Sequence, residues 1–395
     1  MLKKADVLLT GGTVVTMDDS YRLYTDGAVA IAGDVIVAVG PTAVITQTYT
    51  APEIINCQGK VIMPGLVNAH THVPMTLLRG LNDDLRLDVW LGYLMPLERE
   101  FVTPDFVKLG TQIACAEMIR SGVTSFADMY YFEDEIAAET AVIGMRALLG
   151  QTVLIFPAPD AATYEDALVL CRRFIEKWRD HPLIQPAVAP HAWYTGTPEM
   201  NRACADLARA YDVPLHTHVS ETAFEAQNSM EQNHMPVVNW LQKRLAGNQT
   251  AGRPLRPSGR GRNVCPEGSG RGHRPLPHQQ PQARQRHRRH RANAVAGTKC
   301  GRGHRRPGQQ QRPGHVRRGS AGGARMAKTK SNDPTVLPAR QALELATIGG
   351  ARAMHMADKP AAWKRANGPI WRLWRWTACI TSRSSTTTPT RCTRA

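Results

Sequence analysis

The stretch that most constrains this chain is residues 64–80, which read PGLVNAHTHVPMTLLRG. Two short apolar runs, one on each side of a Pro-Gly turn, lead directly into His70-Thr71-His72. Side chains at positions i and i+2 of a strand point to the same side, so both imidazoles face one way. Two neutral imidazoles side by side are typical ligands of zinc or iron. The two histidines of an isolated His-x-His are more often ordinary loop residues. Here the surrounding sequence indicates that they are two of the ligands of a metal site.

That context is an alternation of strand-like and helix-like segments. Residues 5–62 hold short β-rich runs separated by glycine and aspartate turns, which predicts a small β-sheet module. From Pro64 onward, apolar runs alternate with helical segments, and repeated β-α units of this size imply a parallel sheet that about eight units would close into a barrel. Before residue 246 we expect strands at 66–69, 123–128, 147–156, 183–189 and 213–219, and helices at 104–121, 164–179 and 198–211.

The formal charge of +16 is distributed unevenly along the chain. Residues 247–325 hold 18 Arg, one Lys and one acidic residue, and residues 359–395 hold eight basic residues and no acid. The rest of the chain then carries a net charge of −10. We interpret the chain as an acidic globular protein with two basic segments that lack apolar periodicity. Between them, residues 326–358 read as a loop and one amphipathic helix, with Ala342, Leu345, Ala346 and Gly349 at helical spacing.

The sequence also predicts a compartment. Residues 1–10 are short and charged, and no later apolar run reaches membrane length, so we expect neither a signal peptide nor a membrane partner. The eight cysteines are scattered without a CxxC pair, which fits reduced thiols. A cytoplasmic location is therefore expected.

A second histidine motif, His216-Thr217-His218-Val219-Ser220-Glu221, follows the fifth expected strand. Barrel active sites collect at the carboxyl ends of strands, so this motif shares a rim with the first. There, His218 would complete a three-histidine set and Glu221 would lie where a carboxylate can carry protons. His191, after the fourth strand, belongs to the same rim. Each residue alone is as easily a polar loop residue, but four on one rim favour a site.

Four segments together resemble the amidohydrolase superfamily. Within it, the chain is similar to the 5-methylthioadenosine/S-adenosylhomocysteine deaminases, which are related to the triazine and N-ethylammeline hydrolases. The resemblance covers residues 1–246 and 326–358. It rests on VIMPGLVNAHTH (61–72), PMTLLRGLNDDLRLDVWLGYLMPLE (74–98), EMIRSGVTSFADMYYF (117–132) and HTHVSET (216–222).

The resemblance implies an α/β fold, a metal-dependent (β/α)8 barrel with a small β-sandwich built from both chain ends. It also implies one divalent metal per chain, Zn2+ or alternatively Fe2+, and a homo-oligomer in many relatives. By position, metal ligands match His70, His72 and His218, substrate-binding residues match Glu98, His191 and Glu221, and the catalytic proton carrier matches Glu221. Gln151 stands where some relatives carry a substrate-binding Arg, so that role is not transferred. The implied reaction is hydrolytic deamination of an adenosine-type nucleoside with release of ammonia.

Two parts of the family pattern are absent from the sequence: a His-Cys-Val-His-type strand after residue 246 and a later metal-binding Asp in a Thr-Asp-Gly motif. Regrouping by one base the codons that can encode residues 304–316 permits Thr-Asp-Gly, and the same shift within 252–257 permits His-Cys-Val-His. A different shift restores a family-like pattern within 363–370. We therefore expect insertions or deletions near residues 246, 326 and 358.

This hypothesis predicts five segments. They are a β-sandwich module without its C-terminal strands (1–62), the first part of the barrel (63–246), an out-of-frame segment (247–325), a remnant of the last barrel helix region (326–358) and an out-of-frame tail (359–395). The barrel is then incomplete, with an open apolar edge. We expect the chain as written to be insoluble or inactive.

Two other interpretations stay open. One keeps the enzyme but changes the substrate to another aminated or chlorinated heterocycle, such as triazine or guanine, although MTLLRG and WLGYLMPLE favour an adenosine-like nucleoside. The other is a non-catalytic, basic nucleic-acid-binding protein that uses the Arg-rich segment. That segment lacks interleaved aromatic residues and any nucleic-acid-binding module, so no specific nucleic-acid partner is expected.

Overall fold

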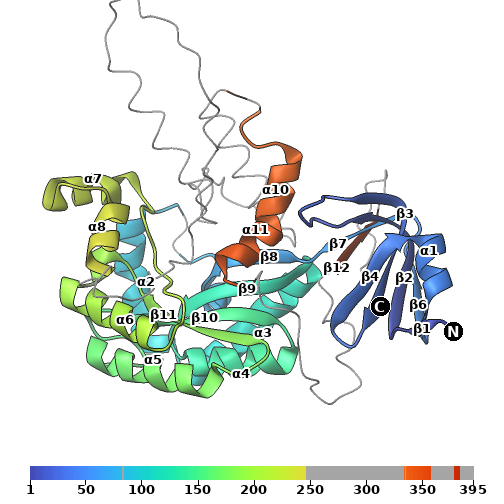
Figure 1. Ribbon diagram of the computed structural model, residues 1–395. Coiled ribbons are helices and arrows are strands. Elements are labelled where there is room, and N and C mark those ends of the chain that lie inside the picture. Colours follow the sequence, from blue (N-terminus) through green and yellow to red (C-terminus); the bar gives the residue numbers. More distant parts are fainter. Residues whose placement is uncertain (82–83, 246–332, 334, 357–377, 383–395) are drawn as a thin grey trace, which may run out of the picture.

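The computed structural model describes residues 1–81, 84–245, 333, 335–356 and 378–382. The Arg-rich segment 247–325 and most of the tail lie outside the described residues, as do the predictions made for them. Two sheets organise the rest: a mainly antiparallel sheet near the N-terminus and a parallel sheet beside it (Figure 1). None of the described helices is both long and apolar enough to cross a lipid bilayer.

The N-terminal sheet has the strand order β12-β7-β2-β3-β4, and β6 also pairs with β2. Its inner residues come from alternate positions of apolar strands, for example Val29 and Ile31, which pack with Val7 and Leu9. A short helix that the sequence analysis did not predict, α1, buries Ile45 against this sheet. β1 and β5 pair with each other in a separate two-stranded sheet. The elements of this N-terminal part are β1 (Lys3–Lys4), β2 (Val7–Val15), β3 (Leu23–Ala32), β4 (Val35–Pro41), α1 (Thr42–Thr48), β5 (Tyr49–Thr50), β6 (Glu53–Asn56) and β7 (Lys60–Pro64).

One strand of this sheet comes from the C-terminal tail, while the division of the chain into five segments stays a prediction. β12 (Ala378–Ser382) pairs antiparallel with β7, with Ala378 opposite Pro64 and Ser382 opposite Lys60. The backbone supplies every hydrogen bond of a strand ladder, so a short segment can complete an open edge whatever family pattern it lacks. In Figure 1 the red arrow of β12 lies beside β7.

The parallel sheet contains β8 (Leu66–Thr71), β9 (Val123–Tyr130), β10 (Arg146–Val153) and β11 (Ile184–Pro190), side by side in chain order. The fifth expected strand, 213–219, is present only as two isolated bridges, Val188 to Leu215 and Ala192 to His218. The ladder is interrupted because Pro190, the next residue in line to donate to this segment, has no N–H. The predicted parallel sheet is otherwise confirmed.

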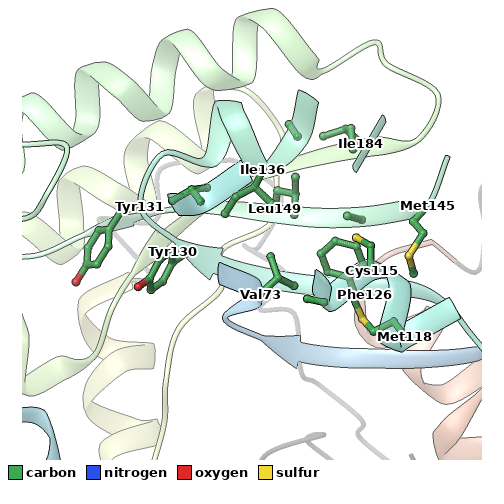
Figure 2. Packing of buried hydrophobic residues seen from close by; sticks show 14 of the residues in the cluster. Val73, Cys115, Met118, Phe126, Tyr130, Tyr131, Ile136, Met145, Leu149 and Ile184 are labelled. Carbon is green, nitrogen blue, oxygen red and sulfur yellow. The ribbon is translucent and has the colours of Figure 1, made fainter. Parts of the chain in front are cut away.

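Helices cover the outer face of this sheet (Figure 1). Three of them begin where a threonine side chain accepts a hydrogen bond from the third helical N–H: Thr103 from Phe106, Thr163 from Asp166 and Thr197 from Met200. Between helices and strands lies the largest apolar core, with Tyr130 and Tyr131 at one end and Met118 and Met145 at the other (Figure 2). These helices are α3 (Pro104–Arg120), α4 (Glu133–Ile143), α5 (Tyr164–Trp178) and α6 (Pro198–Ala210).

The predicted amphipathic helix near residue 345 is two helices, α10 (Ala339–Ala346) and α11 (Ile348–Ala353), with Thr347 between them at φ −128° and ψ −102°. The break lets α11 approach the parallel sheet. A Cβ on Gly350 would lie 2.8 Å from Cβ of Val67, and the Met354 side chain packs with Leu148 and Ala187. The remaining elements are η1 (Val73–Leu78), α2 (Leu87–Phe101), η2 (Trp193–Thr195), α7 (Ala223–Asn233) and α8 (Val237–Leu245).

Candidate metal centre and active site

Three predicted ligands, His70, His72 and His218, meet at the carboxyl ends of the parallel strands. Their ring centroids lie 4.9 to 5.2 Å apart, and one nitrogen of each ring lies within 4.8 Å of the other two. His70 is in β8, His72 immediately follows it, and His218 belongs to the bridged fifth segment. Residues 146 positions apart are thus brought together by the parallel sheet.

Hydrogen bonds fix which ring nitrogens of two of these histidines carry a proton. Nδ1 of His72 lies 2.6 Å from the carbonyl oxygen of Met129, and Nδ1 of His218 lies 2.9 Å from that of His191. A carbonyl only accepts, so each Nδ1 donates and each neutral ring presents an unprotonated Nε2. These two Nε2 atoms lie 3.3 Å apart. Two lone pairs so placed fit a divalent metal, whose histidine ligands usually donate their other N–H in this way.

His216 supports the third ring. Its Nε2 lies 3.3 Å from Nδ1 of His70, and the ring also forms a hydrogen bond with the backbone of Asp128. Burial lowers the pKa of His216 to about 4, so the ring is neutral and can accept from His70. His70 would then also direct Nε2 towards a metal. His216 stands in the second histidine motif, but the sequence alone indicates no role for it.

Two buried carboxyl groups lie behind the His-x-His segment. Asp128 Oδ1 accepts hydrogen bonds of 2.6 Å from the Thr71 hydroxyl and from the N–H of Val73, so it holds the residues on either side of His72. Glu133 accepts from the N–H of Tyr130, and a hydrogen bond between the two carboxyl groups helps to raise the pKa of Glu133. Both residues are fully buried. One shared proton therefore stabilises the pair, since two buried carboxylates would repel each other.

Burial raises the pKa of Asp128 to about 7, an effect opposed by its hydrogen bonds from Thr71 and Val73. Burial is also the largest cause of the raised pKa of Glu133, followed by the charge of Asp128. Sequence reasoning assigned neither carboxyl a role. The sequence signal for such a role was the position of Asp128 near the end of a strand that pairs with the strand carrying His70.

Two of the three predicted substrate residues, Glu98 and His191, lie beside the histidines. Glu98 is 5% exposed and accepts a 2.8 Å hydrogen bond from the hydroxyl of Tyr130, whose ring centroid lies 6.4 Å from that of His72. Burial raises the pKa of Glu98 to about 7, although the hydroxyls of Tyr130 and Tyr131 oppose the shift. Glu98 can therefore exchange a proton near neutral pH or accept hydrogen bonds when ionised.

His191 adjoins the three-histidine cluster, with its ring centroid 4.8 Å from that of His218. Its Nδ1 lies 2.9 Å from the hydroxyl oxygen of Thr195, and that hydroxyl donates to the carbonyl of Ala192. His191 Nδ1 therefore donates and Nε2 can accept. Burial lowers the pKa of His191 to about 3, which keeps the ring neutral.

Glu221 occupies the turn between His218 and α7 and is half-buried. Burial is the main cause of the raised pKa of the Tyr194 hydroxyl, and the charges of Glu221 and Glu225 add to it, so these groups are neighbours. Gln151, the position without a transferred role, is buried and donates to Asp160 over 2.8 Å.

The comparisons with known proteins agree with this geometry. Residues 61–360, from β7 past α11, match the family model described as the Amidohydrolase family. This chain belongs to the amidohydrolase family. The fold class and the family expected from the sequence are therefore confirmed, whereas the reading-frame hypothesis stays a prediction.

Several curated relatives of this amidohydrolase bear the same name. The 5-methylthioadenosine/S-adenosylhomocysteine deaminase 1 of Syntrophus aciditrophicus (strain SB) is 40% identical over 243 residues, which are 61% of this chain and 55% of the relative. A deaminase of the same name from Syntrophobacter fumaroxidans is 42% identical over 246 residues, 62% of this chain and 56% of the relative. The chain thus spans about half the length of the curated relatives it matches.

Solved structures extend the likeness over more of the amidohydrolase chain. An adenosine deaminase from Xanthomonas campestris with bound zinc has a TM-score of 0.73 at 29% identity, covering 91% of this chain and 82% of that one. An atrazine chlorohydrolase from Arthrobacter aurescens TC1 complexed with zinc has a TM-score of 0.54 at 23% identity, covering 60% and 58%. The second likeness supports the fold alone.

Proposed function

We propose that this amidohydrolase hydrolytically deaminates an adenosine-type nucleoside, 5-methylthioadenosine or S-adenosylhomocysteine, and releases ammonia. The observation that carries the proposal is the pair of Nε2 atoms of His72 and His218, 3.3 Å apart, in two rings whose Nδ1 atoms face backbone carbonyl oxygens. This donor set adjoins carboxyl groups in a chain about 40% identical to relatives named for that reaction. The alternative substrate class is another aminated or chlorinated heterocycle, such as guanine or a triazine, bound at the same site.

His70, His72 and His218 would hold one divalent metal, zinc in our proposal, with Fe2+ as the alternative. When bound, such a metal supplies a water whose pKa is lowered towards neutrality, as a nucleophile for C6 of the adenine ring. Glu221 moves a proton to the ring nitrogen beside that carbon, so that the C–N bond can break and ammonia can leave.

The other side chains bind and orient. The Glu98 carboxylate accepts hydrogen bonds from two ribose hydroxyls, while Tyr130 holds it in place. His191 offers the Nε2 acceptor that its donation to Thr195 leaves. We also infer a cytosolic location, which the buried free thiols of Cys57, Cys115, Cys171 and Cys204 support.

The direct test follows absorbance of the adenine chromophore and ammonia release, with zinc supplied. It compares the full chain with its frame-corrected counterpart. We expect the corrected protein to turn over 5-methylthioadenosine faster than guanine or a chlorotriazine, and Glu221→Gln to abolish turnover. Glu199→Gln, which removes an exposed first-turn glutamate of α6, serves as the control. A corrected protein that is active only on guanine or a triazine would overturn the nucleoside proposal.

A further inference from the structure

The turn that carries Glu221 has an unusual backbone. Ser220 adopts φ +54°, in the left-handed region that residues other than glycine avoid. Such a conformation persists only where surrounding contacts impose it. The residue that follows it is the proposed proton carrier, whose side-chain direction depends on this peptide.

Glu225 supplies the contacts. Its Oε1 accepts from the N–H of Ser220 over 3.0 Å, and its Oε2 accepts from the N–H of Glu221 over 2.5 Å. The side chain is 4% exposed. One buried carboxylate thus engages two consecutive peptide groups, and charge-assisted hydrogen bonds of this kind are about twice as strong as neutral ones.

The local sequence explains how Glu225 reaches so far. Residues 222–225, TAFE, have the Thr-x-x-Glu spacing of a capping box, and the Thr222 hydroxyl accepts from the N–H of Glu225 as expected. In a standard box the glutamate would return to the N–H of the capping residue itself. Here the carboxylate extends past Thr222 to the two residues before it, so a helix-capping motif is used to shape the turn.

We propose that Glu225 is a positioning residue that aims the Glu221 carboxylate at the metal centre by holding the two peptide N–H groups in front of it. The inference rests on the proposed function only for the role of Glu221. His218 does not depend on this contact, because its ring is held by the His191 carbonyl. Loss of Glu225 should therefore affect proton transfer and leave metal binding intact.

Two variants test the contact in the full chain. Glu225→Gln keeps the length of the side chain but replaces one acceptor with a donor, and Glu225→Asp keeps the charge but shortens the reach. Both should speed amide hydrogen exchange at Ser220 and Glu221 by about tenfold or more. Exchange elsewhere and zinc content should not change. Glu199→Gln, with the same chemical change in the first turn of α6, should change neither.

Turnover of the frame-corrected protein separates positioning from simple helix stabilisation. Misplacement of the proton carrier in Glu225→Gln should lower kcat by about 10- to 100-fold and leave KM within about twofold. Adding Ser220→Gly should recover much of kcat, because glycine adopts positive φ without a steric penalty. It should not recover slow exchange, since the amides stay unpaired.

Unchanged exchange at Ser220 and Glu221 in both Glu225 variants would overturn the proposal. So would a loss of activity that Ser220→Gly fails to rescue, because helix destabilisation alone gives that result. If no protein, wild type included, turned over any nucleoside while exchange changed as expected, the contact between Glu225 and the two N–H groups would be supported. The assigned reaction would then be wrong.

Discussion

At the residue scale, the least expected feature of the site is that its histidines are supported by carboxyl groups that must stay partly protonated. The carboxyl groups of Asp128 and Glu133 are hydrogen-bonded to each other, and Asp128 in turn holds both neighbours of His72. Folding thus fixes a proton in this pair. The stability of the protein should then depend on pH in a defined direction.

The pKa of Asp128 rises from 3.8 to about 7 on folding, so the folded state binds more protons than the unfolded state between these values. The stabilisation is complete below pH 4 and is lost as pH rises through about 7. Glu133→Gln replaces the shared proton with a permanent N–H donor to Asp128. Between pH 5 and 8 we expect the Tm of this variant to fall by several degrees less than the Tm of the wild type. Each unit by which the variant reduces the pKa shift of Asp128 corresponds to about 1.4 kcal/mol in the free energy of unfolding.

Thermal unfolding across that pH range checks the expectation. Glu135→Gln is the matched control, because Glu135 lies in the same first turn of α4 but forms only a partly exposed ion pair with Lys108. A Glu133→Gln curve parallel to that of the wild type would show that the pair does not share a proton.

Substitution of a proposed metal ligand should weaken zinc binding more than substitution of a residue that supports a ligand. Losing the outer partner of a metal-bound histidine typically weakens metal binding by about 10- to 100-fold, so we expect this from His216→Ala. His72→Ala removes a donor outright and should cost more. Competition with a chromophoric zinc chelator measures both. The exposed His234, at positive φ, gives a control, His234→Asn, which should bind zinc as the wild type does. Equal affinity in all three variants would place the metal elsewhere.

Sequence reasoning could find His70, His72 and His218 because chemistry marks them: imidazoles at a spacing of two, at the ends of apolar strands. It could not find Asp128, Glu133 or Glu225 as supports, because nothing in a single sequence shows which carboxyl will be buried. Their roles follow from contacts made across the sheet, or, for Glu225, from a capping motif whose side chain reaches an unexpected peptide.

At the scale of elements, local signals were reliable where caps and periodicity agree. Thr103-Pro104 and Thr197-Pro198 mark the starts of α3 and α6 within a residue. The signals failed where tertiary contacts decide. Thr347 interrupts a continuous helical pattern so that α11 can reach β8, and Pro190 reduces the fifth strand to bridges.

One close approach between elements shapes the metal centre. Gly110 of α3 lies against η1, the segment directly after His72, and a Cβ there would lie 2.6 Å from the carbonyl oxygen of Pro74 and 2.7 Å from its Cα. Gly110→Ala must push η1 away from the helix. We expect a loss of about 1 to 3 kcal/mol, as for other overpacked cores, together with weaker zinc binding.

Gly92→Ala is the matched control for this substitution. Gly92 also lies within a helix, α2, but its Cβ would meet nothing within 4 Å. Alanine there should stabilise the protein by about 1 kcal/mol through helix propensity alone. Denaturant unfolding of both variants separates the two effects. If Gly110→Ala were as stable as Gly92→Ala, the helix and η1 would not be in the contact described.

At the scale of the whole molecule, the described residues form two sheets of an amidohydrolase-family chain, with segments from early and late in the sequence. Four parallel strands and a bridged fifth segment bring three histidines together, and α11 and β12 show that residues late in the chain return to the parallel and N-terminal sheets. The curated relatives match over residues that are only about 55% of their own length. The family's remaining metal ligand, an Asp, has no counterpart in the sequence as written.

The reading-frame hypothesis explains this combination. Sequencing the DNA across the codons for residues 246, 326 and 358 should reveal an insertion or deletion near each point. The corrected protein should then bind zinc more tightly than the chain as written, because an Asp joins three histidines, and only the corrected protein should deaminate the nucleoside. An uninterrupted frame, together with turnover by the chain as written, would show instead that three histidines and Glu221 suffice for the chemistry, with the fourth ligand supplied by water.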